Sequence, residues 1–162
     1  MNQFKKLNNY VGWTIFLIAS FVYLSTIEKT SSLWDCGEFI SAAYKLEVVH
    51  EPGAPFFLLM GRIFTLFTSD VTQVAIMVNS MSAIASSFTI LFLFWTITAF
   101  GRKIYFKDGE PEQSKMFAVL GAGIVGALAY TFSDSFWFSA VEGEVYAMSS
   151  FFTAVTFWCI LK

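Results

Sequence analysis

Long apolar stretches alternate with short polar segments along the chain. Residues 10–27, 72–100, 116–133 and 146–161 contain no charged side chain, and charged or polar residues flank each stretch. A helix needs roughly 20 apolar residues to cross the hydrocarbon core of a bilayer. We therefore predict about four transmembrane helices in an all-α membrane protein, with residues 1–162 forming a single transmembrane region.

The ends of the first and last stretches bear on processing and length. The first stretch follows Lys5 and Lys6, and no small-residue cleavage site comes after it, so we expect an uncleaved anchor. The last stretch is followed only by Lys162. We expect the chain to be the N-terminal fragment of a longer protein.

The apolar segment 55–67 is different, because it has only thirteen residues and contains Arg62. If it crossed the membrane, Arg102 and Lys103 would lie outside, against the tendency of basic residues to stay in the cytoplasm. We therefore place it in an outer loop, residues 28–71, that carries amphipathic surface or re-entrant helices. This multi-pass topology puts the N-terminus in the cytoplasm and the outer loop on the periplasmic or lumenal face.

Composition supports the membrane class. Hydrophobic residues make up 56% of the chain and charged residues 14%, against roughly 25% charged in ordinary soluble domains. The net charge of -2 gives no support for nucleic-acid binding. Two distant cysteines and one histidine indicate neither a disulfide framework nor a zinc site.

A glycine pattern in the third stretch imitates a nucleotide-binding motif. Gly121, Gly123 and Gly126 fit the spacing G-x-G-x-x-G, but the flanks are continuous membrane helix without the strand that a dinucleotide site requires. Small residues at this spacing let a second helix approach closely. We predict a helix-packing surface here.

Candidate chemistry begins just outside the first span. Asp35 and Glu38 are three residues apart, so a helix that begins at Asp35 would place both carboxylates near its positive end. The same spacing suits an N-cap with a capping-box glutamate. The sequence leaves a cap and a catalytic pair as alternatives.

Two further segments carry polar side chains on the same predicted side. His50 precedes a segment with Pro52, Gly53 and Pro55, which suits a loop that binds a headgroup at the membrane face, although His50 alone could be an interfacial side chain. Arg62 could extend to the interface or contact a lipid phosphate. Between the last two spans, Glu142 and Glu144 lie among aromatic residues, as solvated loop acids or as partners of Asp35 in one cavity.

Taken together, these motifs resemble a known family. The segment Trp34-Asp35-Cys-Gly-Glu38, the segment His50-Glu-Pro-Gly-Ala-Pro55 and the entry Glu144-Val-Tyr-Ala to the last span are similar to the start of the GT-C class of polytopic glycosyltransferases. The resemblance is to bacterial relatives of the transmembrane protein O-mannosyltransferases, and it covers nearly the whole chain. It implies the N-terminal part of a GT-C-like fold.

The resemblance also implies an activity and roles for individual residues. It implies transfer of a sugar, plausibly mannose, from a polyprenyl-phosphate donor to a protein Ser or Thr or another acceptor, at the outer face of the membrane. Asp35, Glu38 and Glu144 match catalytic positions, and Glu142 is a further acidic partner. His50 and Arg62 fall in the region that faces the donor phosphate. Membrane lipid, the carrier and an acceptor protein or glycan are the expected partners; no metal is assigned, and a divalent ion is a further candidate.

Simple chemistry agrees with this implication. A hydroxyl acceptor needs a base within hydrogen-bond reach, and phosphate is already a good leaving group, so positioning and charge neutralisation dominate. Two alternatives use the same residues differently. The chain could be a non-catalytic scaffold or carrier-binding subunit, or a small transporter whose path is lined by Asn79, Ser80, Ser82, Ser86 and Ser87.

Overall fold

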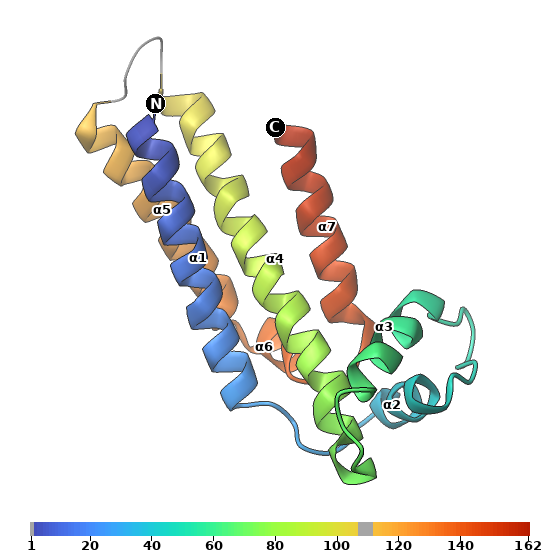
Figure 1. Cartoon of the computed structure of the whole chain (residues 1–162). Helices are drawn as coiled ribbons and strands as arrows, with labels where there is room; N and C mark the ends of the chain where they lie inside the picture. Colours follow the sequence, from blue (N-terminus) through green and yellow to red (C-terminus); the bar gives the residue numbers. More distant parts are fainter. Residues whose placement is uncertain (1, 107–111) are drawn as a thin grey trace.

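The computed structural model describes residues 2–106 and 112–162, and within these all regular secondary structure is helical (Figure 1). The elements, in chain order, are α1 (Asn2–Ser25), α2 (Cys36–Lys45), α3 (Pro55–Thr65), the short 3-10 helix η1 (Val71–Gln73), α4 (Val74–Tyr105), α5 (Gln113–Thr131), α6 (Asp134–Ala140) and α7 (Val145–Leu161). The prediction of an all-α membrane protein is confirmed.

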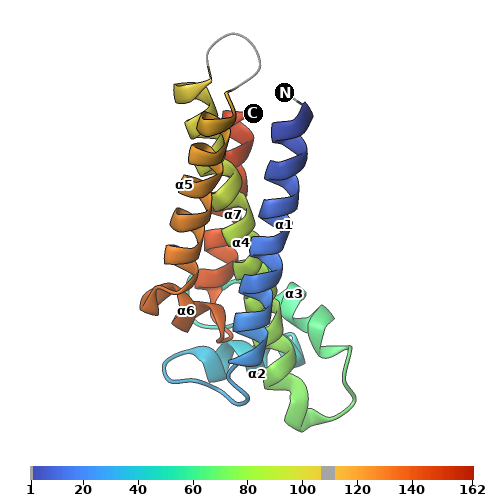
Figure 2. The ribbon, with the colours of Figure 1, turned by 90° about the vertical axis from the view of Figure 1, so that its left-hand side faces the viewer.

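The four long helices α1, α4, α5 and α7 run side by side, and α2, α3 and α6 gather at one end of them (Figures 1 and 2). This end carries Asp35, Glu38, Glu142 and Glu144, and we call it the acidic end. The opposite end holds both chain termini and the last turn of α4, with Lys5, Arg102, Lys103 and Lys162, and we call it the basic end.

Three helical segments in the described part of the chain, Gln3–Ser25, Val71–Tyr105 and Gln113–Thr131, are long and apolar enough to cross a membrane. Helices α6 and α7 meet at a bend of 110° and together make the fourth candidate. Helix α1 begins at Asn2 rather than near residue 10, and α4 continues to Tyr105, because polar residues extend each helix past its apolar part. Arg102 and Lys103 suit the negative end of the α4 dipole.

Helix α3 packs against α2 and α4 at the acidic end and does not run along the bundle (Figure 1). Phe57, Leu58 and Gly61 face the protein, whereas Leu59 and Ile63 are exposed on the other side. The approach is close, because a Cβ on Gly61 would lie 2.9 Å from the Cβ of Ala43. That α3 lies at the membrane surface or re-enters it stays a prediction.

This placement predicts that both ends of α3 lie on one side of the membrane. Cysteines introduced at the exposed positions Glu51 and Ser69 should react with an impermeant thiol reagent from one side, and a cysteine at Lys103 from the other. A Cys159→Ser background suffices, since Cys36 is buried and burial raises the pKa of its thiol. Labelling of positions 51 and 69 from opposite sides would show that α3 crosses the membrane.

Two of the three glycines of the α5 pattern, Gly123 and Gly126, form the predicted helix-packing surface. A Cβ on Gly123 would lie 2.7 Å from Phe94 and Thr98, and a Cβ on Gly126 would lie 2.7 Å from Ile97. These contacts all belong to α4, so the missing side chains allow α4 and α5 to pack closely. Gly121, by contrast, faces open space.

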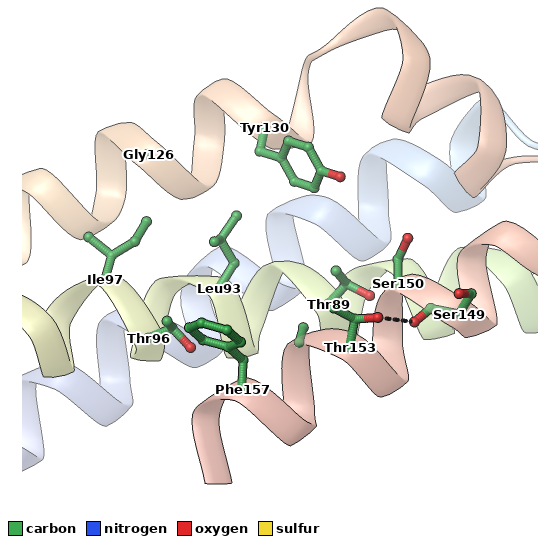
Figure 3. Close-up of a pocket in the computed structure, with 11 residues that line it drawn as sticks. Thr89, Leu93, Thr96, Ile97, Gly126, Tyr130, Ser149, Ser150, Thr153 and Phe157 are labelled. Carbon is green, nitrogen blue, oxygen red and sulfur yellow. Dashed lines mark hydrogen bonds between the residues drawn. The ribbon is translucent and has the colours of Figure 1, made fainter. Parts of the chain in front are cut away.

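Helix α7 leans on α4 and leaves a hollow of about 580 Å³ between α4, α5 and α7 (Figure 3). Leu93, Ile97 and Phe157 give it apolar walls, and Tyr130 projects toward it from α5. The hydroxyl groups along it are partly engaged within α7, where the Thr153 hydroxyl donates to the Ser149 carbonyl. The hollow begins on α7 little more than one helical turn beyond Glu144.

Candidate functional site

Asp35 stands at the position just before α2, where its backbone carbonyl accepts the first hydrogen bond, from Phe39. Its carboxylate makes no capping hydrogen bond and is 55% exposed. Asp35 is therefore the N-cap residue of α2 by position but does not cap the helix through its side chain, and its carboxylate is available at the surface of the acidic end.

Glu38 does not complete a capping box either, because its carboxylate is taken by His50. The backbone N–H of His50 donates to Glu38 Oε1 at 2.8 Å, and His50 Nδ1 lies 2.8 Å from Glu38 Oε2. On the other side of the ring, His50 Nε2 lies 3.9 Å from Asp35 Oδ2. His50 therefore holds the loop that follows α2 against the two carboxylates at the start of α2.

The hydrogen bond and charge of Glu38 raise the pKa of His50 above its ordinary value, and the charges of Asp35 and Glu144 add to this. The same contact lowers the pKa of Glu38. Since the folded-state pKa of His50 is raised, the pair contributes stability below the unfolded pKa, near 6.5, and this is lost as pH rises through the folded value.

The pair can be measured directly, because His50 is the only histidine in the chain. An NMR titration of its ring protons should give a pKa above 6.5, and Glu38→Gln should lower it toward that value. Glu47→Gln, which removes a carboxylate paired with Lys45, is the matched control and should leave the titration unchanged. An unshifted His50 in the wild-type protein would contradict the pair.

A second group of acids approaches from the segment between α6 and α7. The Cys36 thiol lies 3.6 Å from Glu142 Oε2 and 3.5 Å from Glu144 Oε1. Both glutamates are buried, at 5% and 6% exposure. One thiol carries one proton, so it donates to one of the two carboxylates at a time.

This burial changes the acid–base properties of the group. Burial raises the pKa of Glu144, and the negative charges of Glu142 and Asp35 raise it further, while the hydrogen bond from Cys36 opposes them. Burial also raises the pKa of the Cys36 thiol, and the two glutamates add to that shift. Cys36 is therefore a protonated donor to the carboxylates, and its thiol is a poor nucleophile.

Asn79, buried within α4, holds the two acidic segments together. Its Nδ2 donates to the carbonyls of Glu28 at 2.7 Å and Thr30 at 3.2 Å. The backbone N–H of Glu28 in turn donates to the carbonyl of Val141 at 3.1 Å. Gly143 fits against the same amide, since a Cβ there would lie 2.8 Å from Asn79 Oδ1.

Arg62 lies at the other end of α2. Its Nη1 donates to the carbonyl of Tyr44 at 2.7 Å, and its guanidinium lies over the Tyr44 ring at 5.4 Å. Tyr44 is nine residues beyond Asp35, which is about 14 Å along a helix. Arg62 therefore closes the C-terminal end of α2, and its described contacts do not join it to the carboxylates.

The arrangement at the acidic end can hold a cation or take up a proton. Ligand atoms of Asp35, Glu38 and His50 all lie within 4.8 Å of one another, and their carboxylate and imidazole groups suit a divalent metal ion. Asp35 is also exposed enough to reach a hydroxyl of a bound substrate.

Sequence reasoning missed two residues of the site. Cys36 lacks any metal or disulfide spacing, so nothing in the pattern marks it as a neighbour of glutamates more than a hundred residues away. Asn79 gave a usable signal, because a single amide in an uncharged membrane helix is costly unless it is paired. The transporter alternative placed it along a path, whereas its amide binds loop carbonyls.

The fold and site define a multi-pass helical membrane protein with its polar chemistry gathered at one end of the bundle. A family model described as the protein O-mannosyl-transferase TMEM260 N-terminal domain matches residues 35–162. The chain belongs to this family, as the resemblance at the level of sequence motifs led us to expect.

Two curated relatives support the assignment. The chain is 27% identical over 142 residues to protein O-mannosyl-transferase tmem260 of Dictyostelium discoideum, and 25% identical over 142 residues to protein O-mannosyl-transferase TMEM260 of Mus musculus. Each match covers 87% of this chain, and 15% and 18% of the respective relative. No solved structure matches the chain.

Proposed function

We propose that the acidic end is part of the active site of a GT-C-type glycosyltransferase that moves mannose from a polyprenyl-phosphate donor to a Ser or Thr hydroxyl. The names of the relatives supply the reaction class. The observation that carries the proposal is the convergence of Asp35 and Glu38, from the loop after α1, with Glu142 and Glu144, from the segment before α7.

In the proposed reaction the acceptor oxygen attacks the anomeric carbon while the bond from that carbon to the phosphate oxygen breaks. The hydroxyl proton passes to the Asp35 carboxylate, and the polyprenyl phosphate leaves with the bonding electron pair. A single displacement of this kind inverts the anomeric centre. The protein mainly positions the reactants and balances the developing charge.

The neighbouring groups have distinct roles in this scheme. His50, whose pKa is raised by Glu38, carries positive charge over a wider pH range, and we propose that it contacts the donor phosphate. Burial and the charges of Glu142 and Asp35 raise the pKa of Glu144, so Glu144 is a second carboxylate in the site that can take up a proton. If a divalent ion takes part, we propose that Asp35, Glu38 and the neutral form of His50 hold it, with the ion taking the place of the His50 proton.

We further propose that the acidic end faces the periplasm or lumen and the basic end faces the cytoplasm. The support is the distribution of Lys5, Arg102, Lys103 and Lys162, which all lie at the basic end. A donor that is anchored in the membrane by its prenyl chain would then present its phosphate and sugar at the outer surface.

The donor class can be tested with membranes that contain the protein and an acceptor peptide rich in Ser and Thr. Mannose label should reach the peptide from polyprenyl-phosphate mannose, and not from a nucleotide sugar when synthesis of the lipid donor is blocked. Transfer from the nucleotide sugar under that block would overturn the donor assignment. If label reaches the peptide from neither donor, and if substitutions of the carboxylates at the acidic end change only which molecules co-purify with the protein, a non-catalytic scaffold would be favoured.

A further inference from the structure

We infer that a hollow at the basic end binds the phosphate group of an anionic phospholipid. The hollow has a volume of about 450 Å³ and lies between α1, α4 and α7. It is separate from the proposed active site, because the long helices of the bundle lie between the two ends (Figures 1 and 2). The inference therefore does not depend on the proposed function.

Three basic residues line the hollow. Lys5 comes from α1, Arg102 from the last turn of α4, and Lys162 follows α7. No Asp or Glu side chain is among the described residues that line the hollow. Lys and Arg side chains around one hollow suit a phosphate group, the anionic group that lipid headgroups present at a membrane surface.

The wall of the hollow also holds polar groups that lack a protein partner. The indole Nε1 of Trp95 and the side-chain Oδ1 of Asn8 are buried without a hydrogen bond. The Trp95 indole rests against α1 at Gly12, where a Cβ would lie 2.6 Å from Nε1. Leaving a buried donor and acceptor unpaired is costly, so these two residues give the hollow a polar wall beside its charges.

The rest of the lining suits a lipid rather than a small soluble anion. Trp158 lies 5.5 Å from Trp95 between ring centroids, and Lys162 Nζ lies 4.4 Å from the centre of the Trp158 ring. Phe4 and Leu161 add apolar surface beside the charges. A volume of about 450 Å³ is in the range of ligand sites, roughly 300 to 1,000 Å³.

General attraction of a basic protein surface to acidic lipid is the competing explanation, and the chain offers matched pairs that separate the two. Arg102 lines the hollow and its neighbour Lys103 does not; Lys5 lines it and its neighbour Lys6 does not. Removing either member of a pair changes the total charge equally. The two variants of a pair should therefore differ in lipid binding only if the lipid binds in the hollow.

The test is native mass spectrometry of the protein in detergent, titrated with phosphatidylglycerol or with phosphatidylcholine. The wild-type protein should retain one phosphatidylglycerol in preference to phosphatidylcholine. Arg102→Gln should weaken this binding about tenfold, the scale of losing a hydrogen bond to a charged group, while Lys103→Gln stays within about twofold. Lys5→Gln against Lys6→Gln repeats the comparison if the Arg102 variant fails to fold.

The remaining outcomes are also decisive. Equal losses in the two members of a pair, or no preference between the lipids, would overturn the site in favour of general attraction. Inorganic phosphate at millimolar concentration should not displace phosphatidylglycerol. Displacement by inorganic phosphate would overturn the lipid as the source of the phosphate group.

Discussion

Replacing Asp35 by Asn is expected to abolish mannose transfer while the protein still folds and inserts. The change removes the proposed proton acceptor but keeps the size of the side chain. General-base groups contribute roughly 100-fold to 10,000-fold to the rate of a chemical step, so we expect a loss on that scale. The measurement is incorporation of mannose label into an acceptor peptide by membranes that contain matched amounts of each variant.

The structure explains why folding should survive this change. The Asp35 carboxylate makes no capping hydrogen bond and is 55% exposed, so α2 does not depend on it. Asp134→Asn, which neutralises another exposed acid at the same end, is the matched control and should retain transfer. Full transfer by the Asp35 variant would exclude Asp35 as the base.

Replacing Gly143 by Ala is expected to have the second largest effect, and on stability as well as transfer. The added Cβ would lie 2.8 Å from Asn79 Oδ1 and 3.0 Å from the Ile40 side chain. Asn79 cannot move freely, because its Nδ2 donates to two loop carbonyls. Overpacking of this kind costs about 1 to 3 kcal/mol, and we expect a lower Tm in detergent.

The same substitution should also reduce transfer, since Gly143 lies between the two buried glutamates. A displacement of about 1 Å in a catalytic group can lower a rate by roughly 100-fold. Gly121→Ala is the control, because a Cβ there meets nothing within 4 Å and Ala favours a helix. If the Gly143 and Gly121 variants behave alike, the tight fit of Gly143 against Asn79 is not important.

Much of the bundle could be predicted from hydrophobic length alone. The four uncharged stretches became α1, α4, α5 and α7, because a membrane core and helix geometry leave little choice for such segments. Helix α3 packs across one end of the bundle and does not run along it. The 110° bend between α6 and α7 could not be predicted from the sequence, because the segment around Gly143 has no periodic pattern.

The sequence could predict which residues of the candidate site lie on the same side of the bundle, but not which of them are in contact. Asp35 and Glu144 were expected on one side because the spans alternate in direction. The pairing of Glu38 with His50 depends on the path of the loop after α2, and the partner of Arg62 depends on how α3 packs against α2. Such contacts join segments whose relative position no local pattern specifies.

The central claim is that the acidic end of the bundle transfers the sugar, and sealed vesicles of one known orientation test it most directly. An impermeant acceptor peptide is supplied on one side at a time, with polyprenyl-phosphate mannose in the membrane. We predict labelled peptide only when it faces the acidic end, the side on which a cysteine at position 51 reacts. Label acquired from the side of the basic end, or from neither side, would contradict the account.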